Sequence, residues 1–364
     1  MKRAGTMQRD FAWLVMAVVL VVSACAVPSG GGPASTSTRP TMDTQTAQVE
    51  PAVSPEPVAL KLGVLNFMSN SPFFIAAEEG YFSEQGLAVE LVSFGTSDRD
   101  MIPALFQGQL DVALTTVATG MLNGIAQGGR ARYVADKGFL NPQAACAADA
   151  VVVRSELLSD GRLGSASDIG GLTVTFSSAN SFEYAVDLLL EKGHLTRDDV
   201  EIVEIQSHAS RVEAMASGTL DLTAFSEPWI TRGKDTGTLD VWMPLSELLP
   251  NMSIGTVIYG PSMLDRDPDV GVRFLVAYLK AIDQYNQGPT DRNVEIISKY
   301  TELPAEELRE VCWPSYRPDG TIAGEPLLAF QEWALGRGYL DRVLSMEEVW
   351  DPQFVNAAYA IVHR

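Results

Sequence analysis

We predict an α/β protein made of two similar lobes, preceded by a leader and a tether that lie outside the fold. Three observations predict it. The chain has 364 residues, of which 46% are hydrophobic, and this is enough to bury more than one core. Short β-rich runs alternate with amphipathic helical runs, which is typical of a parallel sheet covered by helices. The order of these runs then recurs about 110 residues later in the chain.

The first residues have the pattern of an export signal. Lys2, Arg3 and Arg9 precede an apolar run at 11–22, which small residues and Cys25 follow. Residues 22–25, with the sequence V-S-A-C, resemble the bacterial lipobox, in which the cysteine is lipidated and the peptide is cut in front of it. We therefore expect a signal peptide at 1–24 and a lipid anchor on Cys25. An ordinary secretory signal and an uncleaved membrane anchor are the alternatives.

Residues 25–57 form the expected tether. They are rich in Gly, Ser, Thr and Pro and contain almost no large apolar side chain. Such a segment cannot bury enough surface to offset its ordering entropy, so we expect a flexible linker between the membrane and the fold.

The repeated unit is strand, helix, strand, helix, strand. In the first copy we expect strands at 60–65, 88–94 and 111–115, with helices at 72–79 and 101–107. In the second copy we expect strands at 172–176, 200–205 and 221–224, with helices at 182–192 and 211–217. The exits of the last helices match in kind, G-Q-L-D-V at 108–112 and G-T-L-D-L at 218–222, and each glycine is free to adopt the left-handed cap conformation.

The repeat also predicts a cleft. Ligands of open parallel sheets bind beyond the carboxyl ends of the strands, where loops and helix N-termini present unpaired N–H groups. The same loops supply good helix caps, so part of this polar set is expected only to cap helices. The residues that we expect at the cleft are Asn66, Ser71, Phe73, Thr115, Thr116, Ser178, Asn180, Ser181, Tyr184, Glu227 and Trp229.

Composition excludes other kinds of partner. The formal net charge of -20, with no basic run to interrupt it, disfavours nucleic acid. The 3 cysteines and 3 histidines are too scattered for a structural zinc site, which needs closely spaced pairs of ligands. We therefore expect neither a metal centre nor another cofactor.

Several segments together resemble a known family, the solute-binding proteins of ABC importers that carry nitrate, sulfonates, taurine or thiamine-pyrimidine precursors. The resemblance covers about 58–362. It rests on S-P-F-F-I-A at 71–76 followed by E-G-Y-F at 79–82, G-Q-L-D-V at 108–112, L-L-L-E-K-G at 188–193, D-D-V-E at 198–201 and E-P-W at 227–229.

This resemblance implies a two-lobed type II periplasmic-binding-protein fold with the ligand between the lobes. It implies that 58–150 begin lobe 1, 151–249 form lobe 2, and 250–364 return to complete lobe 1 with a helical tail. The chain contains no phosphate-binding G-x-x-x-x-G-K-[ST] motif, so an ATPase and a permease are the expected partners. A monomer held at the outer face of the cell membrane is the expected state.

The cleft loops favour one class of ligand. They contain no lysine, and Arg99 and Arg211 lie at their margins, whereas Phe67, Phe73, Tyr184 and Trp229 offer aromatic faces and Glu227 offers an acceptor. We therefore expect a vitamin-type heteroaromatic solute, such as riboflavin or a thiamine pyrimidine precursor. A sulfonate, taurine or nitrate is the alternative, because helix N-termini alone can bind anions.

Two further alternatives concern reactive side chains. Eukaryotic pyrimidine synthases share this fold, but His194, His208 and His363 have no cysteine cluster near them, so we do not expect an enzyme. Cys146 and Cys312 could form a disulfide in an exported protein or remain two buried thiols, and the sequence leaves both open.

Overall fold

The computed structural model describes residues 56–95, 98–205 and 207–364. The predicted signal peptide, Cys25 and nearly all of the tether lie outside the described residues. Among the described helices, none is both long enough and apolar enough to span a bilayer.

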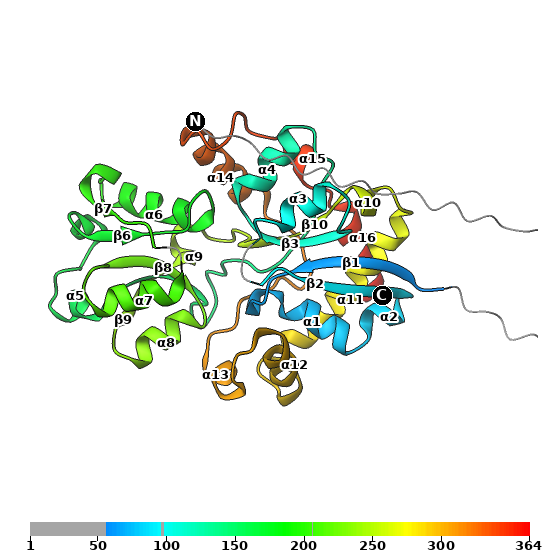
Figure 1. The fold of residues 1–364 in the computed structure, drawn as a ribbon, viewed down its shortest axis with the longest axis horizontal. Helices are drawn as coiled ribbons and strands as arrows, with labels where there is room; N and C mark the ends of the chain where they lie inside the picture. Colours follow the sequence, from blue (N-terminus) through cyan, green and yellow to red (C-terminus); the bar gives the residue numbers. More distant parts are fainter. Residues whose placement is uncertain (1–55, 96–97, 206) are drawn as a thin grey trace, which may run out of the picture. The chain divides into compact units, whose positions relative to one another are not determined.

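The described strands form two five-stranded sheets (Figure 1). The first sheet has the order β2-β1-β3-β10-β4, and the second has the order β7-β6-β8-β5-β9. The strands of the first sheet are β1 (Val58–Val64), β2 (Leu87–Ser93), β3 (Val112–Thr116), β4 (Arg132–Asp136) and β10 (Gly255–Tyr259). Those of the second are β5 (Asp149–Arg154), β6 (Thr173–Thr175), β7 (Glu201–Ile202), β8 (Leu222–Ser226) and β9 (Leu239–Pro244). The predicted fold class is confirmed.

The two sheets share one topology. In each sheet, the three strands of the predicted repeat are parallel. A fourth, inserted strand pairs antiparallel with the third strand of the repeat: β10, from later in the chain, pairs with β3, and β5, from earlier in the chain, pairs with β8. A fifth strand pairs antiparallel with the inserted one, so β4 and β9 run in the direction of the repeat strands. The carboxyl ends of β1, β2, β3 and β4 therefore share one edge, and those of β6, β7, β8 and β9 share the equivalent edge.

Helices connect and cover these strands. In the first repeat and its connection they are α1 (Ser71–Glu78), α2 (Tyr81–Glu84), α3 (Met101–Phe106) and α4 (Thr119–Ala126). Around the second sheet they are α5 (Ser155–Ser159), α6 (Ser181–Lys192), α7 (His208–Ala216), α8 (Trp229–Asp235) and α9 (Leu245–Leu248). The tail contains α10 (Pro261–Leu264), α11 (Pro268–Tyr285), α12 (Asp291–Thr301), α13 (Ala305–Glu310), α14 (Gly324–Gly336), α15 (Met346–Val349) and α16 (Gln353–Val362).

The helix exits behave as the repeat predicts. Gly108 and Gly218 have φ of +72° and +74°, the left-handed conformation that a side chain disfavours. The exit of α6 differs from the prediction, because Gly193 has φ -82° and the left-handed residue is His194. Gly193 is required for another reason: a Cβ on it would lie 2.3 Å from the Ala166 carbonyl oxygen.

Two predicted elements change in extent or role. The strand expected at 200–205 is reduced to β7, an edge strand whose two residues are exposed and pair only with β6. The tail, which the resemblance assigns to lobe 1, also packs on the second repeat: Tyr184 of α6 contacts Phe330 and Trp333 of α14, with ring centroids 6.0 and 5.2 Å apart. These aromatic contacts bury apolar surface that α6 cannot bury against its own short sheet.

Candidate functional site at the carboxyl edges of the two sheets

The same register occurs at the carboxyl edge of both sheets. The last residue of β3, Thr116, pairs with Gly255, the first residue of β10. The last residue of β8, Ser226, pairs with Asp149, the first residue of β5. Each edge therefore presents the end of a repeat strand beside the start of an inserted strand, and the loops that leave these positions are those predicted to face the ligand.

The loops after β3 and β6 meet each other. The Thr119 amide donates to the Ala179 carbonyl oxygen at 3.0 Å, and the Ser181 amide donates to that of Val117 at 3.3 Å. Ala118 and Asn180 form an antiparallel bridge between these two bonds. The carboxyl edges of the two sheets thus face each other and are joined by main-chain hydrogen bonds.

In the first repeat, two of the predicted polar residues have local partners. Asn66 accepts a hydrogen bond from the Ser93 hydroxyl at 2.8 Å, and Ser71 donates to the Met68 carbonyl oxygen at 2.6 Å. Thr116 lies 3.4 Å from the Asp98 carboxylate. The Thr115 hydroxyl is fully buried and has no hydrogen-bond partner among the described residues.

In the second repeat, the predicted residues surround the start of α6. Asn180 is the N-cap, and its side-chain oxygen accepts from the Phe182 and Glu183 amides. Ser178 is exposed. Ser181 is 2% exposed, and its hydroxyl has no partner among the described residues. An unpartnered hydroxyl at a helix start is available to a ligand oxygen.

Glu227 and Trp229 are held by neighbours. The Glu227 carboxylate accepts from the Thr231 amide at 3.0 Å and the Thr231 hydroxyl at 2.9 Å, so it caps the start of α8. It also accepts from the Cys312 amide at 3.4 Å, and burial raises its pKa. The half-buried Trp229 ring stacks on His208, with ring centroids 5.8 Å apart.

Two predicted residues do not lie at the site. Phe73 is fully buried and stacks on Tyr278 at a centroid distance of 4.2 Å, because α1 begins at Ser71 and directs Phe73 into the core of the first lobe. Tyr184 is 9% exposed and packs on α14, as described above. Both rings pack in the protein core. They do not contribute to the aromatic surface that the sequence predicts for the cleft.

The sequence reasoning missed Lys137 and Asp149, which are 2% and 7% exposed at the two carboxyl edges. Lys137 directly follows β4, a strand that lies outside the repeated unit, and Asp149 begins β5. The sequence pattern that could have indicated Lys137 is the charged pair Asp136-Lys137 directly after the apolar run 133–135. Charged side chains are rarely fully buried unless they have a partner. The predicted cleft loops contain no lysine, and Lys137 lies outside these loops, directly after β4.

Burial controls the charge of these groups. It lowers the pKa of Lys137 to about 8, although the carboxylates of Asp136, Asp98 and Asp149 oppose the shift. It raises the pKa of Asp149 to about 6, and the hydrogen bond from the Ser226 hydroxyl, at 2.5 Å, opposes that shift. Burial also raises the pKa of Asp136 to about 6, while Arg317 at 3.2 Å favours its ionised form.

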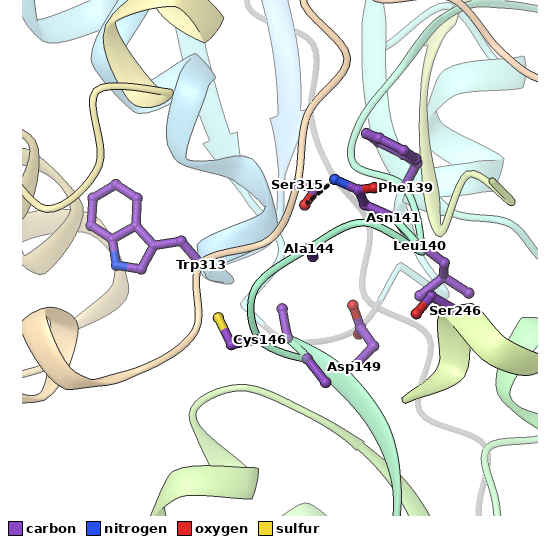
Figure 2. A pocket seen from close by; sticks show the side chains of 11 residues that line it. Phe139, Leu140, Asn141, Ala144, Cys146, Asp149, Ser246, Trp313 and Ser315 are labelled. Atoms are coloured by element: carbon purple, nitrogen blue, oxygen red, sulfur yellow. Dashed lines mark hydrogen bonds between the residues drawn. The ribbon is translucent and has the colours of Figure 1, made fainter. Parts of the chain in front are cut away.

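The crossing between the sheets is tied to the tail. Cys146, in the segment between β4 and β5, forms a disulfide with Cys312, and the two Cα atoms are 5.9 Å apart. Figure 2 shows the adjoining pocket, where Asn141 contacts Ser315 at 3.5 Å and Asp149 contributes to the wall. This pocket has a volume of ≈ 20 Å³, which holds about one water molecule and no organic solute.

The described residues contain no group of three or more potential metal ligands. His208 stacks on Trp229, and burial lowers its pKa to about 4. The two described cysteines are both oxidised in the disulfide. No cysteine–histidine pair for nucleophilic catalysis is present among the described residues.

Two matching α/β sheets whose carboxyl edges face each other define the periplasmic-binding-protein fold. Solved structures share it. The aliphatic sulphonate binding protein SsuA from Escherichia coli has 17% sequence identity, a TM-score of 0.67, and coverage of 82% of this chain and 94% of its own. The nitrate-binding protein NrtA from Synechocystis PCC 6803 has 14% identity and a TM-score of 0.67, and the match covers 85% of this chain and 90% of NrtA. The desulfurization enzyme DSZB has 15% identity and a TM-score of 0.59, and the match covers 84% of this chain and 100% of DSZB.

The chain belongs to the NMT1-like family, whose model matches residues 53–242. The family that the sequence resemblance predicted is thus confirmed. No curated protein matches the chain. At these identities the solved structures show the fold alone, and they include both binding proteins and an enzyme.

Proposed function

We propose that the chain is the extracytoplasmic solute-binding component of an ABC importer, which captures a small organic solute between its lobes and delivers it to a separate permease and ATPase. The observation that carries the proposal is the meeting of the loops after β3 and β6. Beside them lie the buried hydroxyls of Thr115 and Ser181, which have no hydrogen-bond partner within the described ranges. The sulphonate-binding protein SsuA and the nitrate-binding protein NrtA share the fold.

The fold suits reversible capture. The chain crosses between the sheets twice, between β4 and β5 and between β9 and β10. Two crossings can serve as a hinge, so that the lobes part to admit a solute and close to exclude water. The contacts between the Thr119 and Ser181 amides and the opposite lobe would be made in the closed form.

Two classes of solute compete for the site. A vitamin-type heteroaromatic solute, such as riboflavin or a thiamine pyrimidine, is favoured by the half-buried Trp229 and Phe67 rings. A sulfonate, taurine or nitrate is favoured by the buried Lys137. The first preference depended on cleft loops without lysine and on the Glu227 carboxylate, and the buried Lys137 at the carboxyl edge gives the second class the stronger support.

We also propose that Cys25 carries the lipid that holds the protein at the membrane. The support is the V-S-A-C sequence after the apolar run. Intact mass of the membrane-extracted protein should show a chain that begins at Cys25 with acyl groups, and Cys25→Ser should be released in soluble form. A native protein that retains residues 1–24 would contradict the anchor without affecting the solute site.

Titration of the purified fold tests the importer proposal. We expect saturable binding of a solute from the panel of riboflavin, a thiamine-type aminopyrimidine, taurine, an alkanesulfonate and nitrate, followed by tryptophan fluorescence and by calorimetry. The bound solute should be recovered unchanged after long incubation. Chemical conversion of the solute would instead support an enzyme, and failure of every panel member to bind would contradict the proposal.

A further inference from the structure

Lys137 is a buried cation that no carboxylate contacts in the part of the chain that the structure describes. Its side chain is 2% exposed, and its ammonium contacts the Ser69 hydroxyl at 3.2 Å and the Ser69 carbonyl oxygen at 3.4 Å. Among the described residues, no carboxylate oxygen lies within the 4.0 Å of an ion pair with it. Two long hydrogen bonds to neutral oxygens are weak compensation for an ammonium that is removed from water.

The neighbouring polar groups are committed to other partners. Asp136 is paired with Arg317 at 3.2 Å, and Asp149 accepts from the Ser226 hydroxyl. The Tyr316 hydroxyl also donates to the Ser69 carbonyl oxygen, at 2.5 Å, so Lys137 shares one of its two acceptors. The ammonium therefore retains donor capacity that the described residues do not use.

The backbone is shaped to hold Lys137 at the carboxyl edge. Gly255 lies beside it, and a Cβ on Gly255 would be 2.6 Å from the Lys137 Cε and 2.8 Å from its Nζ. A glycine at the start of β10 is thus required for the lysine to reach its position. Gly255 pairs with Thr116, so this position is at the end of β3, where the predicted ligand loop begins.

We propose that Lys137 is the anchor for an anionic oxygen group of the captured solute, such as a carboxylate, a sulfonate or nitrate. This inference rests on the proposed solute-binding function and specifies the class of solute. The carboxylates of Asp136, Asp98 and Asp149 favour the charged form of Lys137 but do not contact it, so the ammonium gains a charge-assisted hydrogen bond only in the complex. Heteroaromatic solutes fit the site when they carry such a group.

The Lys137→Met variant is the central test. Methionine keeps an unbranched side chain of similar length and removes the charge. An anionic panel member, taurine, ethanesulfonate or nitrate, should bind the wild-type protein and bind Lys137→Met about 10- to 100-fold more weakly, the range of one hydrogen bond to a charged group. The exposed Lys192, changed to Met in the control variant, should leave the affinity unchanged.

Stability distinguishes an anchor from a structural lysine. Removing a buried charge without an ion-pair partner should leave the thermal midpoint of the solute-free protein unchanged or raise it. Gly255→Ala provides a second variant, because it preserves the charge but displaces the ammonium, and it should also weaken anion binding. A lower midpoint for Lys137→Met, with equal loss of binding of charged and neutral probes, would show a structural role and overturn the inference.

The other outcomes separate the two proposals. If riboflavin or the aminopyrimidine binds and no anionic probe does, Lys137 is not the anchor, but the solute-binding function stands. Equal affinity of an anionic probe for Lys137→Met and the wild type has the same meaning. If no probe binds the wild type, both proposals are contradicted.

Discussion

Asp149 is buried at the first position of β5, and its ionised form is disfavoured there. One carboxylate oxygen accepts from the Ser226 hydroxyl, but burial raises the pKa from 3.8 to about 6. Between these two pH values the folded state retains a proton that the unfolded state has lost. Stability therefore falls as the pH rises through this window, and the cost above pH 6 is about 3 kcal/mol.

The Asp149→Asn variant should recover part of this cost. An asparagine oxygen can still accept from Ser226, while the charge is absent. At about pH 7.5 we expect unfolding in urea to require up to about 3 kcal/mol more than in the wild type, and at about pH 4 we expect the two proteins to converge. A gain of equal size at both pH values would show that the charge of Asp149 is not the cause.

Several residue positions could not be predicted from the sequence. A buried aromatic and a ligand-facing one look alike at the start of a helix, and Phe73, in the predicted helix 72–79, lies on the buried face of α1. Lys137 and Asp149 acquire their environment from partners distant in the chain, such as Ser69 and Ser226. The capping roles of Asn180 and Glu227 are local and were open to prediction as an alternative to ligand contact.

The order of strands and helices in the repeats was more predictable, because it depends on local patterns. The helix-exit motif, G-Q-L-D-V at 108–112 and G-T-L-D-L at 218–222, recurs because its aspartate has the same structural role in both repeats. Asp111 accepts from the Lys61 amide at 2.8 Å, and Asp221 accepts from the Thr173 amide at 2.9 Å. Each therefore joins the third strand of its repeat to the first. Each also pairs with an arginine, Arg266 in one case and Arg154 in the other.

The Asp221→Ala variant should loosen the second sheet. It removes the acceptor for the Thr173 amide and for Arg154, which contacts Asp221 at 2.8 Å. Hydrogen bonds to a charged acceptor contribute about 1.5–3 kcal/mol each, so we expect a loss of about 2–4 kcal/mol in the free energy of unfolding. Asp341→Ala, at an exposed position, is the matched control. A loss below about 0.5 kcal/mol would contradict the role of this motif in joining the strands.

The disulfide connects parts of the molecule that are 166 residues apart in sequence. Local patterns cannot select such a pairing, and for this reason the sequence left the state of the two cysteines open. The chain-entropy account gives about 5 kcal/mol for a closed loop of this length as an upper value. The Cys146–Cys312 bond ties the crossing between the sheets to the tail, next to the Asp149 wall of the pocket in Figure 2.

Reduction of the disulfide should lower the free energy of unfolding by about 2–5 kcal/mol, measured in urea with and without reductant. The Cys146→Ala, Cys312→Ala double variant should be insensitive to reductant and should match the reduced wild type. Identical unfolding curves for the oxidised and reduced wild type would contradict a stabilising disulfide.

The central claim at the scale of the whole molecule is that a solute holds the two lobes together at their carboxyl edges. Amide hydrogen exchange at Thr119 and Ser181 tests it most directly, since both amides donate across the lobes. Saturation with the anionic panel member that binds should slow exchange at these two amides in the wild-type protein, and the same concentration should have little effect in Lys137→Met. Saturable binding that leaves exchange at both amides unchanged would contradict capture between the lobes.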